Sequence, residues 1–127
     1  MVTVEFTQSG KGFALVVYGH AGAAQRGQDL VCCAASTLIY TAAQCALDLY
    51  GEGALRQFPE IVTESGDAQV AAVATEEGIE QVQQMFRTVA TGLEMLARQY
   101  SENVHFVKRI NMAHPEQKET PGADKGG

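Results

Sequence analysis

The longest uncharged stretch of the sequence runs from Leu30 to Leu47 and spans 18 residues. Its length is close to that of a membrane-spanning helix. Four polar residues interrupt it: Ser36, Thr37, Thr41 and Gln44. No Lys or Arg anchors its ends. We therefore expect a buried helix in a soluble protein and no membrane association.

The spacing of apolar residues supports a helix from Leu30 to about Tyr50. These residues recur at alternating intervals of four and three, which places them on one helical stripe. They are Val31, Ala35, Leu38, Ala42, Cys45 and Leu49. Asp29 precedes the helix and is a residue type that caps helix N-termini. Gly51 ends the helix.

Shorter segments on both sides of this helix read as strands and as one further helix. Strands are expected at residues 2–6, 13–18, 60–64, 69–74 and 104–110. Turn residues at 9–12 and 65–67 join neighbouring strands into hairpins. A second apolar helical stripe runs from Ile79 to Tyr100. The predicted element order is ββαββαβ.

Length and composition indicate one folded domain. The chain has 127 residues, of which 46% are apolar, enough for a single core. We assign the domain to residues 1–110. Residues 111–127 hold two Pro, three Gly and little to bury, so a disordered C-terminal tail is expected there.

Charge and cysteine content narrow the classes of function. The net charge of −6 argues against nucleic-acid binding, which needs clustered Lys and Arg. Three cysteines, two of them adjacent, do not suggest a disulfide framework, so a reducing, cytoplasmic setting is expected. The N-terminus lacks the basic region and apolar stretch of a secretory signal.

His20 and Cys32 are the strongest candidates for chemistry. His20 follows the second strand, and Cys32 is expected at the third residue of the long helix, after a Gly/Ala-rich loop. Free N–H groups at a helix N-terminus stabilise a thiolate and can also hold an oxyanion. A nearby imidazole can accept the thiol proton. This combination is typical of a cysteine nucleophile with a histidine base.

Other interpretations of these residues stay open at this point. A free Cys often serves only as a small buried hydrophobe, and a His beside Gly is often a loop residue. A non-enzymatic binding module could keep the pattern for structural reasons. A metal or redox site of His20, Cys32 and Cys33 is disfavoured, because structural zinc usually needs four ligands and adjacent cysteines bridge badly.

A longer block around these residues carries a family resemblance. The block comprises Gly19-His20-Ala21, Gly27, Asp29, Val31-Cys32 and Ala34-Ala35-Ser36. It resembles the signature of the ribosomal-processing cysteine proteases, the Prp or YsxB-like family, and the element order agrees across about residues 1–110. The resemblance implies an α+β fold, a small mixed or antiparallel sheet packed against two α-helices, and a catalytic dyad of His20 and Cys32 without metal or cofactor.

The resemblance also implies a substrate and an assembly. Members of the family are endopeptidases that remove a short N-terminal extension from a large-subunit ribosomal protein, at a site that follows an aromatic pair. The expected partner is therefore that ribosomal-protein N-terminal peptide, with a second copy of the chain in a homodimer. The acidic surface fits a basic substrate of this kind. The alternative is a non-enzymatic, ribosome-associated binding module that keeps the motif for structural reasons.

Cys33 departs from the family pattern, in which Ala is common after the nucleophile. Adjacent helix residues point about 100° apart, so both thiols cannot face one substrate. We expect Cys33 to be packed inside, with a second reactive thiol as the alternative. Cys45 falls on the apolar stripe and is assigned to the core. His105 and His114 have no partner that suggests catalysis.

Four residues are assigned supporting roles: Gly19, Gly27, Asp29 and Ser36. Asp29 is expected to cap the helix, or alternatively to orient His20. Ser36 lies one turn after Cys32, where it could hydrogen-bond near the site or to a helix carbonyl. Gly27 could let the loop approach the substrate or hinge, or could serve only a turn.

Overall fold

The computed structural model describes residues 1–19, 28–64 and 66–111. The elements are β1 (Val2–Ser9), β2 (Gly12–Tyr18), α1 (Gln28–Gly51), β3 (Glu60–Glu64), β4 (Asp67–Val73), α2 (Ile79–Gln99) and β5 (Val104–Asn111). This order confirms the predicted ββαββαβ arrangement. Asn111, which was assigned to the tail, is the last residue of β5 instead. Residues 112–127 lie outside the described part of the chain.

The five strands form one mixed sheet in the order β3-β4-β2-β1-β5. Both hairpins, β1–β2 and β3–β4, are antiparallel, as is the β2–β4 pair. β5 pairs in parallel with β1. The tight β1–β2 connection needs a left-handed backbone, which Gly10 supplies with a φ of 59°. The sheet therefore has two outer strands, β3 and β5.

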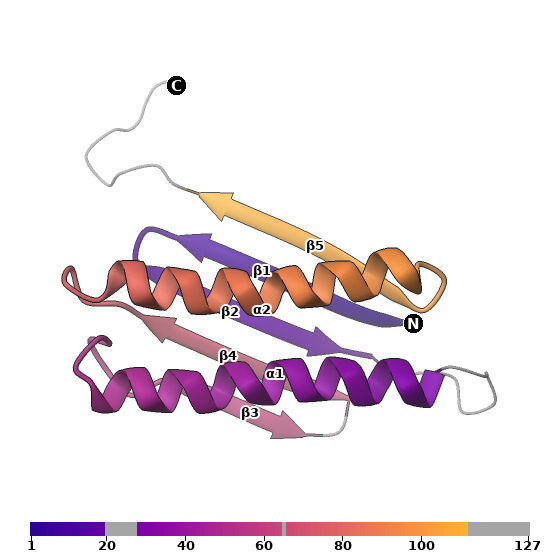
Figure 1. The fold of residues 1–127 in the computed structure, drawn as a ribbon, viewed down its shortest axis with the longest axis horizontal. Coiled ribbons are helices and arrows are strands. Elements are labelled where there is room, and N and C mark those ends of the chain that lie inside the picture. The colour runs from indigo at the N-terminus through magenta and orange to yellow at the C-terminus, as the bar shows by residue number, and fades with distance from the viewer. Residues whose placement is uncertain (20–27, 65, 112–127) are drawn as a thin grey trace.

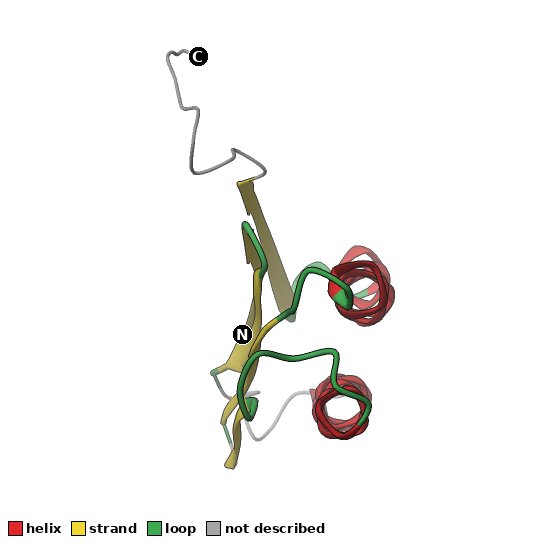
Figure 2. Cartoon of the chain, turned by 90° about the vertical axis from the view of Figure 1, so that its left-hand side faces the viewer, coloured by secondary structure: helices red, strands yellow, loops and turns green. Residues whose placement is uncertain are grey.

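Both helices cover the same face of the sheet, and the opposite face carries no helix from the described residues (Figure 2). α1 lies over the β3–β4 side and α2 over the β1–β5 side (Figure 1). In detail, α1 contacts β4 and α2, while α2 contacts β2 and β5. The protein is thus a two-layer α+β structure, which confirms the expected fold class.

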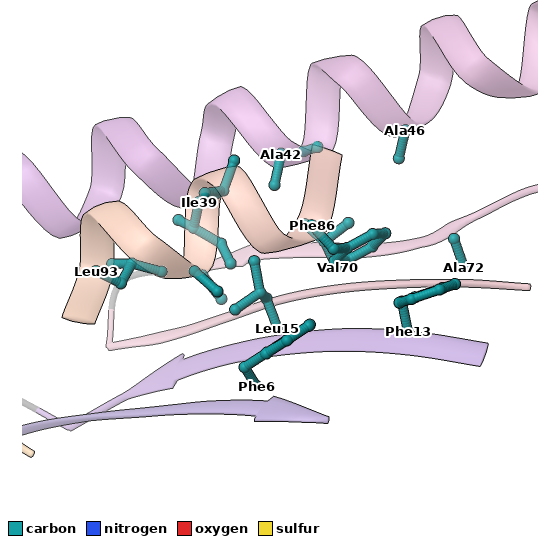
Figure 3. Packing of buried hydrophobic residues seen from close by; sticks show 14 of the residues in the cluster. Phe6, Phe13, Leu15, Ile39, Ala42, Ala46, Val70, Ala72, Phe86 and Leu93 are labelled. Atoms are coloured by element: carbon teal, nitrogen blue, oxygen red, sulfur yellow. The ribbon is translucent and has the colours of Figure 1, made fainter. Parts of the chain in front are cut away.

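The core lies between the sheet and the two helices (Figure 3). Alternate residues of β1, such as Val4 and Phe6, point into it because successive side chains of a strand face opposite sides. At its centre the rings of Phe13 and Phe86 stack with centroids 5.4 Å apart. Each such buried apolar side chain contributes about 1.5–3 kcal/mol.

α1 is long and apolar enough to cross a membrane by length and composition alone. In the structure one of its faces is buried against the sheet. That face consists of Val31, Ala35, Ile39, Ala42, Ala43, Ala46 and Leu49. Four of these residues are alanines, and their small side chains leave room for the helix to approach the strands closely.

Two residues of the apolar stripe predicted for α1 face α2 instead of the sheet. Leu38 and Cys45 are only half-buried, and the adjacent Ile39 and Ala46 occupy the buried positions. Cys45 lines a shallow groove between the two helices, so its assignment to the core was wrong. Residues 30–47 of this helix carry no charge and two neighbouring stripes of them are both apolar, so periodicity alone did not separate the stripes.

Candidate active site

A cavity of about 230 Å³ lies where the start of α1, the end of β2 and the β3–β4 turn meet. These segments, together with the N-terminus, gather at one end of the molecule (Figure 1). The apolar part of the cavity wall includes Val2, Val17, Ile39 and Ala68. Its polar part includes Ser36, Glu64 and Asp67. The site therefore combines apolar wall residues with a few polar ones.

Cys32 lines this cavity from the first part of α1. It is half-buried, packs against the core and is not in a disulfide. Ser36, one turn later, lines the same cavity, as expected for residues four apart on a helix. Helical side chains lean toward the N-terminus, so the thiol leans toward the first turn of α1.

The start of α1 corrects two predictions. The helix begins at Gln28, so Asp29 is its second residue and not its N-cap. Cys32 is therefore the fifth helical residue and not the third. Both Gln28 and an acidic residue in the first turn are compatible with helix, the latter because it complements the helix dipole. Neither Gln28 nor Asp29 prevents the helix from starting before Leu30.

The two-residue shift changes which N–H groups are free. In an α-helix the N–H of the fifth residue donates to the carbonyl of the first, so the Cys32 N–H donates to the Gln28 carbonyl. The unpaired N–H groups of the described first turn are those of Gln28, Asp29 and Leu30. Any oxyanion stabilisation by this helix end would come from these groups rather than from the Cys32 amide.

Cys33 is exposed, so the prediction that it is packed inside was wrong. The rotation of about 100° between adjacent residues does separate the two thiols, as expected. It turns Cys33 outward, however, because Cys32 already occupies the side that faces the sheet. Of the three cysteines, Cys32 is the one that lines the cavity beside the β3–β4 turn.

Gly19 fixes the end of β2 at the cavity wall. Its φ of 104° is a conformation that residues with a side chain rarely adopt, and a Cβ placed there would stand 2.5 Å from the Met1 carbonyl oxygen. Its N–H donates a hydrogen bond to the Gly66 carbonyl at 3.1 Å. The N-terminus, β2 and the β3–β4 turn are thereby joined immediately before His20.

Tyr18 anchors the same strand end on the opposite face of the sheet. Its hydroxyl donates a hydrogen bond to a Glu5 carboxylate oxygen at 2.9 Å. This hydrogen bond, with a smaller contribution from burial, raises the pKa of Tyr18 above its usual value, because losing the proton would set two negative charges together. Arg109 also binds Glu5, at 3.2 Å. Glu5 thus links side chains of β1, β2 and β5 on this face of the sheet.

Several predicted site residues lie outside the described residues, namely His20, Gly27 and the loop between them. His114 lies outside them as well. His105 is exposed on β5, the outer strand farthest from β3. Within residues 1–19, 28–64 and 66–111, no three His, Cys, Asp or Glu side chains are placed to hold a metal ion.

Comparison with known proteins identifies the family. The sequence model of the family described as "Cysteine protease Prp" matches residues 1–105. The chain belongs to the Prp family of cysteine proteases. A relative named "Ribosomal processing cysteine protease Prp", from Staphylococcus aureus, is 24% identical over 106 residues, which cover 82% of this chain and 95% of the relative.

Solved Prp structures share the fold. Prp from S. aureus in complex with a substrate peptide superposes with a TM-score of 0.64 at 20% identity, covering 86% of this chain and all of that one. Prp from S. aureus with a covalently linked product peptide gives a TM-score of 0.62 at 21% identity, with the same coverage. Membership of the Prp family makes this protein an enzyme, a cysteine protease.

The structure adds residues that the sequence did not single out. Tyr40, Glu64, Gly66 and Asp67 line the cavity with Cys32. The turn at residues 65–67 was predicted as a hairpin, which β3 and β4 confirm. No local pattern indicated that its tip lies opposite the start of α1, because that proximity arises from packing between distant segments.

Proposed function

We propose that the protein removes a short N-terminal extension from a large-subunit ribosomal protein, with Cys32 as nucleophile and His20 as general base. The observation that carries the proposal is the position of Cys32. It is the cysteine that lines the cavity, and Gly19, the residue before His20, lines the same cavity. Family membership supports thiol protease chemistry in this chain.

The mechanism follows from these two groups and the helix end. His20 removes the proton from the Cys32 thiol, and the thiolate attacks the scissile carbonyl carbon. First-turn N–H groups of α1 stabilise the negative charge that develops on the carbonyl oxygen. The His20 imidazolium then gives its proton to the leaving amine, which departs. Water hydrolyses the remaining thioester and restores the free thiol.

The cavity suits an apolar residue of the substrate next to the scissile bond. Val2, Val17, Ile39 and Ala68 contribute apolar wall, and aromatic side chains of the expected cleavage motif would bury surface against it. The S. aureus relative is named for ribosomal processing, which favours the same substrate class here. We extend the proposal to a cytoplasmic homodimer without nucleic-acid or membrane partners.

The test is cleavage of a peptide that spans the extension of the cognate ribosomal protein, followed by mass spectrometry. Wild-type protein is expected to cut after the aromatic pair. Cys32→Ala and His20→Ala should each lower kcat by roughly a thousandfold or more, because each removes a member of a cooperating pair. The matched controls, Cys33→Ala and His105→Ala, should keep activity within about threefold of the wild type.

Three outcomes would contradict parts of this proposal. Activity that survives in Cys32→Ala and disappears in Cys33→Ala would assign the nucleophile to the exposed thiol. Full activity of His20→Ala would remove His20 from the mechanism. If folded wild-type protein cuts unrelated peptides but not the ribosomal peptide, the assignment as a protease stands and the proposed ribosomal substrate is wrong.

A further inference from the structure

β3 forms an edge of the sheet, and among the described residues it pairs only with β4. Two hydrogen bonds show which residues of β4 face β3. The Val73 carbonyl accepts the N–H of Arg56 at 2.8 Å on the β3 side. The next residue, Ala74, donates its N–H to the Lys11 carbonyl at 2.8 Å on the β2 side.

Main-chain groups alternate in direction along a strand, so this parity extends through β4. Asp67, Gln69 and Ala71 share the parity of Val73 and bond β3, where their partners are Glu64, Val62 and Glu60. The intervening residues of β3, Ile61 and Thr63, therefore direct their N–H and C=O groups away from the sheet. Such an edge is a template for one further strand.

The open edge leads to the candidate active site. β3 ends at Glu64, and Glu64 lines the cavity together with Cys32. In Figure 1, β3 runs along the border of the sheet on the α1 side. A peptide paired with Ile61 and Thr63 would therefore reach the border of the cavity where it passes Glu64.

We infer that the substrate peptide binds as an additional strand on the β3 edge, with the scissile bond beyond Glu64 next to Cys32. The inference rests on the proposed protease function and adds its mode of substrate binding. Main-chain hydrogen bonds supply affinity in this mode, and the alternate side chains of the peptide meet two different surfaces.

The helix side of the added strand meets an apolar surface. Leu38 and Cys45 line grooves shared with α2. Tyr40 comes two residues after Leu38, and Leu47 comes two residues after Cys45. Two residues correspond to a rotation of about 200° around the helix, so Tyr40 and Leu47 lie on the flank of α1 away from α2. Tyr40 is 47% and Leu47 36% exposed. Apolar peptide side chains would bury this flank.

The opposite side of the added strand meets carboxylates. Ile61 packs against the core, so Glu60 and Glu64 lie on the open face of the sheet, and Asp67 is paired with Glu64. None of the three forms an ion pair within residues 1–19, 28–64 and 66–111. The bound segment should therefore alternate apolar residues toward α1 with basic residues on the other side.

The first test replaces backbone amides of the ribosomal extension peptide, one at a time, by N-methyl amides. A strand on an edge uses every second amide. KM should rise roughly two- to tenfold at alternate positions on one side of the scissile bond, the range for one lost hydrogen bond. At the positions between, KM should change less than twofold. A flat profile on a cleaved peptide would overturn the inference and leave the proposed function standing.

The second test changes the protein. Thr63→Pro removes an N–H that points away from β4, so the β3–β4 ladder is kept. Compared with the matched Thr63→Ala, it should raise KM by roughly two- to tenfold with kcat within twofold. A wild-type KM in Thr63→Pro would overturn the inference. So would an altered association state in sedimentation without a change in KM, because the edge would then serve a second copy. A peptide neither bound nor cleaved would overturn both proposals.

Discussion

Gly19 is held in a conformation that only glycine adopts readily. Its φ is 104°, and the space for a side chain is filled by the Met1 carbonyl. Gly10 also has a positive φ, of 59°, but nothing lies within 4 Å of the position of its Cβ. The two glycines thus separate the effect of backbone conformation from that of a steric clash next to the active site.

Gly19→Ala should lower the free energy of unfolding by about 2–4 kcal/mol, because backbone strain adds to the clash. Gly10→Ala should cost about 1 kcal/mol and leave kcat/KM within twofold. Gly19→Ala should lower kcat/KM at least about tenfold, since it displaces the strand end that precedes His20. Denaturant unfolding and peptide cleavage measure both effects. Equal stability losses in the two variants would contradict the predicted clash.

For single residues, the sequence indicated the start of α1, which borders the cavity, but it did not predict the direction of every side chain there. The cavity position of Cys32 and Ser36 agrees with the predicted helical spacing. The interior assignment of Cys33 was wrong, because the direction of one residue relative to the sheet depends on the rotation of α1. A helix with apolar residues on several sides does not define that rotation in its sequence.

The connection between β4 and α2 packs closely against the segment that follows α1. A Cβ on Gly78 would stand 2.6 Å from the Ala54 carbonyl oxygen and 2.7 Å from its Cα. Thr75 donates its N–H to the same carbonyl at 2.9 Å and accepts the Gly78 N–H at 2.9 Å. This cluster holds the start of α2 against the chain that follows α1.

Gly78→Ala should lower the free energy of unfolding by about 2 kcal/mol or more, because the main-chain atoms of Ala54 cannot move aside cheaply. Gly51→Ala is the matched control. Gly51 ends α1 and has no atom within 4 Å of the position of its Cβ. Gly51→Ala should raise the free energy of unfolding by up to about 1 kcal/mol, because it reduces the backbone freedom of the unfolded chain. Thermal unfolding should show a lower Tm for the first variant and an unchanged or higher Tm for the second. A stabilised Gly78→Ala would contradict the described contact.

Element identity was predictable from periodicity, whereas element ends were not. α2 buries Val82, Phe86, Val89 and Leu93 of its predicted stripe. By contrast, β1 extends to Ser9, three residues beyond the predicted strand, because pairing with β2 and β5 continues there. The ends of an element depend on its hydrogen-bonding neighbours, which a local pattern does not contain.

At the scale of the whole molecule, the order of the strands in the sheet determines which segments meet at the candidate active site. β5 joins the sheet beside β1 in parallel, and β4 inserts next to β2. This order places the β3–β4 turn across from the start of α1 and leaves β3 at the edge (Figure 1). Strands distant in sequence make these pairs, so the predicted order of elements alone did not show that Glu64 and Asp67 border the cavity.

The central claim is that Cys32 is the nucleophile of this protease. A peptide with the sequence that precedes the scissile bond and a thiol-reactive group at its C-terminus should be incubated with the wild-type protein, then located by tandem mass spectrometry. The account predicts labelling of Cys32, blocked by an excess of uncleaved substrate, with Cys33 and Cys45 unlabelled. Labelling of Cys33 in place of Cys32 would contradict it.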